Sequence, residues 1–321
     1  MNTIAELFLG CLLGLKDSIL GLIVLTKIDS EEKERDGRPP SRRSTRQRQP
    51  DKKKVQILPL LAQSCLLNGG ALLVSVLVFE GYIIPAVQYI MVFVSSFFIR
   101  DNGLQSSLWS YVEPVMKYTF QYLWVIPLFW LSKILNCIWF VEIADGAYRK
   151  KYGRPVSSLI SSKDNIFKVI SKSMADFLFS ILVEIFFLIQ AQLVGLIPVF
   201  GTTLLYVHMS LLYSLYAFEY TWSNLGWTVV RRVGFIETYW PYFTGFGFLL
   251  SVLTYISTST IASAGIFGTV FPVFILSALE AKPHEECEYP LRLFSLVIWL
   301  TNKLFLFRSP VKSKSSTETN K

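Results

Sequence analysis

The sequence predicts an all-α membrane protein. The expected architecture is a polytopic transmembrane helical bundle with amphipathic terminal helices, in which some hairpins can penetrate the membrane part-way. Hydrophobic residues make up 52% of the 321 residues and charged residues 17%, whereas soluble domains carry about 25% charged residues. The apolar residues form long runs without the two-residue alternation of a barrel. Because lipid offers no partner to the backbone, such runs must be helices.

The first predicted element is an amphipathic N-terminal helix over residues 1–28. Its apolar residues recur at helical spacing, and Lys16 and Asp17 interrupt it near the middle. A secretory signal peptide has a basic start and an uninterrupted core, whereas this segment carries Glu6 and the Lys16–Asp17 pair. The helix is therefore predicted to stay in the membrane, at the interface or at the edge of the bundle.

Residues 29–56 predict a disordered basic linker on the cytosolic side. Residues 37–54 hold eight basic residues against Asp51, while the whole chain has a net charge of +8. Proline and serine are interleaved with these charges, which opposes folding. The alternatives are a solvated topogenic linker, contact with anionic lipid headgroups, and recognition by a transport receptor. The candidate contact residues are Arg42, Arg43, Arg46, Arg48, Lys52, Lys53 and Lys54.

The transmembrane bundle is expected over residues 57–280. Asn68-Gly69-Gly70 is predicted to divide a short entry piece from a span over residues 71–94, and a second span returns over 118–141. The stretch 95–117 between them suits a lumenal connection, and the basic stretch 142–172 suits the cytosol. Residues 173–197 then span outward, 204–222 return, and Arg231 and Arg232 mark another cytosolic connection.

The remaining elements lie near the C-terminus. The arms within residues 243–279 are short, so they are either two tilted spans or a hairpin that penetrates part-way. Residues 281–308 are predicted to contain an amphipathic helix, and 309–321 a disordered cytosolic tail. Both termini are therefore expected in the cytosol.

The segment from Leu204 to Trp222 is predicted to be the polar seam of the bundle. It carries His208 and Glu219, which are eleven residues apart and therefore about 16 Å apart on nearly the same face of a helix. They cannot contact each other, so each needs a partner from another helix.

Two further ionisable residues fall within apolar segments. Glu184 lies near the middle of its span, where a carboxylate marks either a functional pathway or a protonated group hydrogen-bonded to Gln190, Gln192 or His208. Lys133 lies far enough inward to extend its amine toward the interface. With two histidines and no nucleophile or phosphate-binding motif, the chain is predicted to be no enzyme and to need no cofactor or metal.

The seam also carries the clearest family resemblance. The run from His208 to Tyr216, followed by Phe218-Glu219-Tyr220, resembles the signature of the etoposide-induced protein 2.4 family, which includes the ectopic P-granules autophagy protein 4. The supporting motifs are Lys16-Asp17-Ser18-Ile19, Asn68-Gly69-Gly70, Leu123-Trp124-Val125, Leu131-Ser132-Lys133, Ile143-Ala144-Asp145, Trp240-Pro241-Tyr242, Gly245-Phe246-Gly247 and Leu291-Arg292-Leu293-Phe294.

The resemblance implies a multi-pass protein of the endoplasmic reticulum membrane, required for autophagosomes to mature into degradative autolysosomes, with links to cell death and growth control. It implies membrane lipids and proteins of the autophagy machinery as partners, and no nucleic acid. It also implies glutamine at the position of Glu184, which favours the hydrogen-bonded role. A similarity in helix layout to bacterial sulfate-permease-like proteins leaves a second class open, a transporter or channel for a small anion or lipid.

Overall fold

The computed structural model describes residues 3–21, 23, 57–97, 102–153, 166–257, 259–283, 287 and 289–308. Every regular element within these ranges is a helix, so the prediction of an all-α fold is confirmed. The predicted basic linker and the C-terminal tail lie outside the described residues.

The elements are α1 (Thr3–Ser18), α3 (Ile57–Cys65), η1 (Leu66–Val74), α4 (Ser75–Val78), η2 (Phe79–Ile83), α5 (Ile84–Ser95), α6 (Asn102–Phe120), η3 (Gln121–Val125), α7 (Ile126–Tyr152), α9 (Ile166–Gly195), α10 (Gly201–Asn224), α11 (Val229–Thr238), α12 (Trp240–Tyr255), α13 (Thr260–Glu280) and α14 (Ser295–Arg308).

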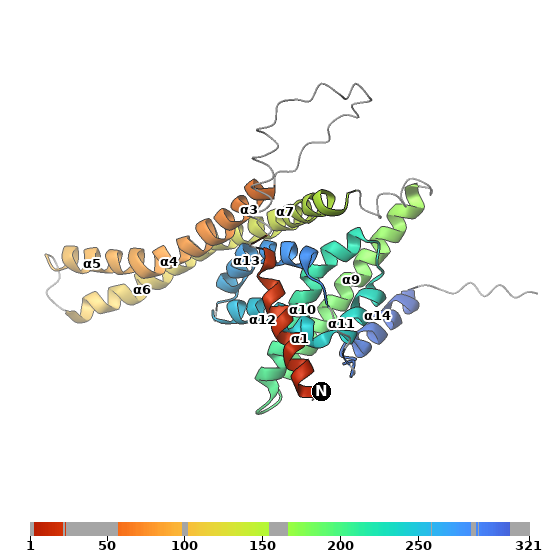
Figure 1. Ribbon diagram of the computed structural model, residues 1–321. Coiled ribbons are helices and arrows are strands. Elements are labelled where there is room, and N and C mark those ends of the chain that lie inside the picture. Colours follow the sequence, from red (N-terminus) through yellow and green to blue (C-terminus); the bar gives the residue numbers. More distant parts are fainter. Residues whose placement is uncertain are drawn as a thin grey trace, which may run out of the picture.

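Two long helical arms extend from one side of the bundle (Figure 1). The first runs without a break from Ile57 to Ser95 and the second from Gly103 to Tyr152, which is 39 and 50 residues. At about 1.5 Å per residue the arms are roughly 58 and 75 Å long, about 2 and 2.5 times the thickness of a hydrocarbon core. The predicted division at Asn68-Gly69-Gly70 is absent from the first arm. The stretch predicted as a lumenal connection is largely helical, within α6.

Two π-helical segments, η2 and η3, explain how the arms stay continuous at Pro85 and Pro127. Pro85 and Pro127 each occupy one of the first positions of an α-helix that directly follows a π-helical turn, η2 or η3. Proline lacks an N–H group and its ring clashes with the carbonyl four residues earlier. A widened turn before the ring accommodates both defects, so the helix changes geometry locally and does not end.

Helix α10 lies at the centre of the bundle and packs against α7, α9, α11, α12 and α13 (Figure 1). Its buried residues are Gly201 at its start and most positions from His208 to Asn224. Phe218 anchors the contact with α12, with its ring centroid 5.0 Å from that of Phe243 and 4.8 Å from that of Phe246. The segment predicted as the seam is therefore the helix around which the others are arranged.

Helix α1 packs along α12 and also contacts α13. The helices approach so closely that a Cβ atom on Gly14 would lie 1.9 Å from the Tyr242 carbonyl oxygen. The Lys16–Asp17 pair lies in the last turn of α1 and has a structural role, because Asp17 accepts a hydrogen bond of 2.7 Å from the Tyr242 hydroxyl. Phe8 and Leu12 remain exposed on the opposite side. The helix is thus an integral part of the bundle edge.

Within the described residues, four helices are long and apolar enough to cross a membrane: Ile57–Ser95, Gly103–Tyr152, Leu178–Gly195 and Thr260–Glu280. Helix α10 has the length but is not among them, because its hydroxyl-bearing and ionisable residues lower its hydropathy. Helix α12 has 16 residues, about 24 Å, which is short of a hydrocarbon core. Of the two arms predicted within residues 243–279, only α13 meets the requirement, which favours part-way penetration by α12.

The turn between α9 and α10 holds a strained residue. Val199 has a φ of 69°, a left-handed conformation that a β-branched side chain disfavours. Because its side chain is 89% exposed, Val199→Gly removes the strain without removing packing. We expect the variant to gain about 1 kcal/mol of stability, read as a higher thermal unfolding midpoint in detergent. Leu196→Gly, in the same turn with ordinary backbone angles, is the control, and equal midpoints for the two variants would contradict the assignment.

Candidate functional site

An ion pair joins the seam to two other helices. Glu219 Oε1 accepts a hydrogen bond of 2.7 Å from Arg232 Nη1 of α11 and another from the Ser180 hydroxyl of α9. Arg232 also donates from Nε to the Trp227 carbonyl at 3.0 Å. Both partners are largely buried, with 10% of the Arg232 side chain and 25% of the Glu219 side chain exposed. The prediction that Glu219 needs a partner from another helix is confirmed.

Glu184 belongs to the same cluster. It lies one turn beyond Ser180 on α9, and its carboxyl is within hydrogen-bonding reach of Glu219 and Ser180. Two carboxyls can hydrogen-bond to each other only when one of them carries a proton. The neighbours expected from the sequence were Gln190, Gln192 or His208, and this was wrong. Gln190 lies six residues, about 9 Å, farther along α9, and Gln192 is exposed.

His208 forms a separate contact at the other end of the seam. Its Nδ1 lies 2.8 Å from the Leu204 carbonyl, which can only accept, so Nδ1 carries the proton. Its Nε2 lies 3.4 Å from Gln190 Nε2 of α9, which therefore donates to it. The Phe187 ring stacks on the imidazole with centroids 5.4 Å apart. His208 is thus a buried residue whose partner comes from another helix, as predicted.

The C-terminal segment is anchored to this end of the seam. Gln190 Nε2 also donates to the Leu293 carbonyl at 3.0 Å, and Phe187 stacks on Phe294 with centroids 3.9 Å apart. Glu237 of α11 accepts a hydrogen bond of 2.9 Å from the Phe294 amide. Burial raises the pKa of Glu237, and the Phe294 hydrogen bond and the charge of Arg292 oppose that rise. The segment that precedes α14 is therefore held against α9 and α11, and α14 itself packs on α9.

A cavity of about 470 Å³ opens beside the Glu184–Glu219 pair, between α7, α9, α10 and α13. Its residues fall at helical spacing on one face of each helix, as Tyr216, Tyr220 and Ser223 do on α10. A third carboxyl, Asp145 of α7, lies in the same wall and accepts a hydrogen bond of 2.9 Å from Asn224. The lining residues are Cys137, Phe140, Val141, Asp145, Ser180, Ile181, Glu184, Tyr216, Glu219, Tyr220, Ser223, Asn224, Phe267 and Phe271.

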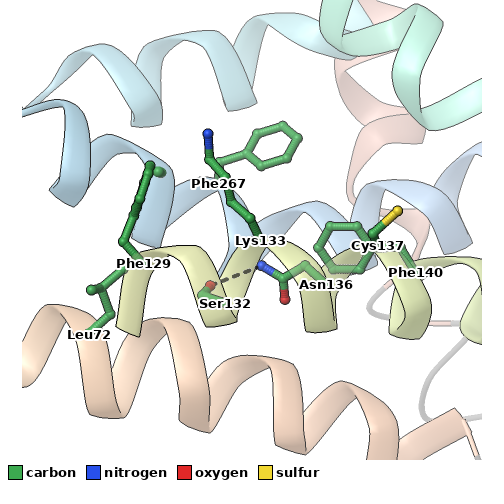
Figure 2. A pocket seen from close by; sticks show the side chains of 9 residues that line it. Leu72, Phe129, Ser132, Lys133, Asn136, Cys137, Phe140 and Phe267 are labelled. Atoms are coloured by element: carbon green, nitrogen blue, oxygen red, sulfur yellow. Dashed lines mark hydrogen bonds between the residues drawn. The ribbon is translucent and has the colours of Figure 1, made fainter. Parts of the chain in front are cut away.

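A smaller cavity of about 250 Å³ adjoins it along α7, and the two share Cys137, Phe140 and Phe267. Figure 2 shows Lys133 extending from α7 toward Phe267 of α13 in this cavity. The Lys133 amine lies 4.6 Å from the centre of the Phe129 ring, a cation–π contact. Of the residues predicted from the sequence, Glu184 and Glu219 thus share the larger cavity, Lys133 lies in its neighbour, and His208 lines neither.

Sequence reasoning missed a buried amide and hydroxyl network, two members of which, Ser132 and Asn136, line the smaller cavity. Asn68 is fully buried, donates to Asn136 Oδ1 at 2.9 Å and accepts from the Ser132 hydroxyl. Ser64 donates to the Gly268 carbonyl at 3.0 Å. Ser64 and Asn68, like Ser132 and Asn136, are four residues apart and hence on one face of a helix. That spacing was the signal available in the sequence. The hydrogen bonds themselves explain why the first arm packs against α7 and α13.

No group of three or more histidine, cysteine, aspartate or glutamate residues in the described parts of the chain could hold a metal ion. The seven basic candidates of the linker, from Arg42 to Lys54, lie outside the described residues. Their role stays a prediction.

Comparison with known families gives a match over most of the bundle. A family model described as sulfate transporter CysZ/etoposide-induced protein 2.4 matches residues 47–263, about two thirds of the chain. The chain belongs to this family. The resemblance drawn from the seam motifs is therefore confirmed, and the family contains both classes of protein that the sequence had suggested.

Three curated relatives agree with the family match. Ectopic P granules protein 4 of Caenorhabditis elegans is 32% identical over 169 residues, 52% of this chain and 51% of that protein. The protein EI24 homolog of Arabidopsis thaliana is 28% identical over 257 residues, 74% of this chain and 79% of that protein. The protein EI24 homolog of Dictyostelium discoideum is 28% identical over 167 residues, half of each chain. The match thus spans about half the length of the first and third relatives. No solved structure matches.

Proposed function

We propose that this protein is a multi-pass protein of the endoplasmic reticulum membrane that is required for autophagy, in the maturation of autophagosomes into degradative autolysosomes. It acts without catalysis, by organising membrane and partner proteins, and contributes through this pathway to cell death and growth control. The observation that carries the proposal is the family match over residues 47–263 on an all-helical fold with four helices able to cross a membrane.

The geometry of the seam supports a structural centre. His208 is bound to Gln190, and Glu219 to Arg232 and Ser180, so these polar groups hold helices together inside the bundle. The long arms offer a different surface, with large apolar residues such as Leu77, Tyr89 and Leu123 exposed along them. Such side chains suit contact with membrane lipid. Partners from the autophagy machinery, and a transport receptor for the basic linker, belong to the same proposal.

The test is a comparison of autophagosome maturation in cells with and without this protein. A tandem fluorescent reporter whose one colour is quenched by acid separates autophagosomes from autolysosomes. Loss of the protein should leave autophagosomes unacidified, and re-expression of the wild type should restore acidification. Equal acidification in cells that lack the protein would reject the proposal.

The basic linker gives a prediction of its own. Replacing its seven candidate residues by glutamine removes seven positive charges, and attraction to an anionic membrane is about 1 kcal/mol per basic residue. We expect the variant to fold, with an unchanged thermal midpoint, and to restore autophagosome maturation less well than the wild type. Replacing the same residues by the other basic type, arginine by lysine and lysine by arginine, is the control. Full rescue by the glutamine variant would exclude this role.

A second candidate function, transport of a small anion or lipid, is favoured by the two adjoining cavities beside α7. The three carboxyls in the larger cavity do not suit an anion. Sulfate and lipid movement in proteoliposomes, measured for the wild type and for the double variant Glu184→Gln, His208→Ala, tests this function. Movement lost in the double variant supports transport, and a trace equal to empty vesicles rejects it.

A further inference from the structure

The larger cavity is lined by carboxyl groups together with aromatic rings, a combination that is typical neither of a packed core nor of an anion site. Three helices each contribute a carboxyl: Asp145 from α7, Glu184 from α9 and Glu219 from α10. Aromatic rings from α7, α10 and α13 form much of the remaining wall. They are Phe140, Tyr216, Tyr220, Phe267 and Phe271. A volume of about 470 Å³ is within the range of about 300–1,000 Å³ that small-molecule sites occupy.

The charges of the wall define what it can attract. Arg232 is paired with Glu219 but is not among the residues that line the cavity, and no lysine or arginine is among those lining residues. One of the three carboxyls carries a proton, because Glu184 and Glu219 hydrogen-bond to each other, so two negative charges face the cavity against one guanidinium behind the wall. The wall suits a cation. A small hard cation such as Mg²⁺ or Ca²⁺ needs six or more oxygen ligands, whereas most of this wall is ring and aliphatic carbon.

Aromatic faces beside carboxylates are the surroundings that recognise organic ammonium groups, because the rings attract the cation and also cover its carbon substituents. We propose that this cavity binds an organic ammonium group, of the kind carried by an aminophospholipid headgroup or by a free alkylamine. The carboxyls supply the counter-charge, and the tyrosine and phenylalanine rings contact the carbons beside the nitrogen.

The adjoining cavity extends the site in a way that fits a lipid source. It shares Cys137, Phe140 and Phe267 with the ammonium site and continues past the apolar side chains of Leu72 and Phe129. Lys133 lies in this second cavity, where its amine can meet the phosphate of a phospholipid. A zwitterionic headgroup would thus have its amine in the acidic cavity and its phosphate beside Lys133.

Cys137 allows occupancy to be measured directly, because it lines both cavities and is exposed. The experiment follows its alkylation by N-ethylmaleimide in the purified full chain in detergent, by mass spectrometry. Lysophosphatidylethanolamine should slow alkylation of Cys137 severalfold and leave Cys287 unchanged. Its N-acetylated form, which has no positive charge, and lysophosphatidylglycerol should not protect. Equal protection by either of these two would overturn the proposal.

Free ethanolamine separates the two sources of the ammonium group. Protection by ethanolamine at concentrations similar to those of the lysolipid assigns the site to free amines, and protection by the lysolipid alone assigns it to a headgroup. If neither the lysolipid nor ethanolamine protects Cys137, the proposal is overturned. The result is independent of autophagy, so a failure here leaves the proposed function standing.

Matched variants separate binding from folding. Asp145→Asn removes a charge but keeps an oxygen that can accept from Asn224, and it should weaken protection at least about tenfold. Glu142→Gln removes a charge from an exposed residue three positions earlier on α7, outside both cavities. In this variant the lysolipid should protect Cys137 as well as it does in the wild type. Equal affinity in Asp145→Asn and Glu142→Gln would contradict the site.

Discussion

Arg232→Ala should destabilise the protein by about 3 kcal/mol, among the largest effects expected of one substitution here. The change removes the partner of Glu219 and leaves two neighbouring carboxyls, Glu184 and Glu219, in a largely buried place. Breaking a buried ion pair costs about 3–5 kcal/mol because the remaining charge has no compensation. The loss is measured as a shift in the denaturant midpoint of the protein in detergent.

The neighbouring arginine is the control. Arg231 is exposed and contacts the Trp227 ring at 4.1 Å, so Arg231→Ala should cost less than about 1 kcal/mol. The double variant Arg232→Ala, Glu219→Gln should recover part of the loss, because the unpaired charge is gone. Equal effects of the two arginine variants, or no recovery in the double variant, would show that the pair does not hold the seam together.

Gly245→Leu should separate α1 from α12. A Cβ atom on Gly245 would lie 1.9 Å from the Cys11 carbonyl oxygen, and that oxygen belongs to backbone, which cannot rotate away. Overpacking of this kind costs about 1–3 kcal/mol or more, so we expect a loss of about 3 kcal/mol. Because Cys11 is partly buried under this contact, its alkylation should become faster at the same time.

Gly81→Leu is the matched control, because a Cβ atom there would meet nothing within 4 Å. It should leave both the thermal midpoint and the alkylation of Cys11 close to the wild type. An unchanged alkylation rate of Cys11 in Gly245→Leu would show that α1 does not depend on this contact.

The sequence predicted that His208 and Glu219 need partners from other helices, but not which partners they have. That His208 and Glu219 each require a partner from another helix follows from burial alone. Which partner each has depends on how α9 and α11 are placed against α10, and local spacing does not carry that information. Arg232 illustrates the difference: the sequence marked it only as part of a cytosolic connection, and the structure shows that it is buried against Glu219. Asp145 was likewise assigned to a cytosolic stretch and lines the cavity.

The long arms show a second limit. Glycine pairs and prolines usually end a helix, and on that basis a division of the first arm at Asn68-Gly69-Gly70 was predicted. The structure keeps the arm helical through a π-helical segment, η1, whose Asn68 bonds to Asn136 and Ser132 of α7. A tertiary contact therefore offsets the local preference. The polar stretch that was predicted as a connection is a second example. Most of it lies in α6, a helix that packs against α5.

The central claim, that the protein acts in autophagy from the endoplasmic reticulum membrane, is tested most directly by a confined rescue. Cells lacking the protein receive a version with a cytosolic C-terminal dilysine signal, which returns membrane proteins to the endoplasmic reticulum, or a matched version with two serines. Autophagosome acidification is measured in both. We predict full restoration by the confined version. Restoration by the serine version alone, with the confined version inactive, would contradict the claim.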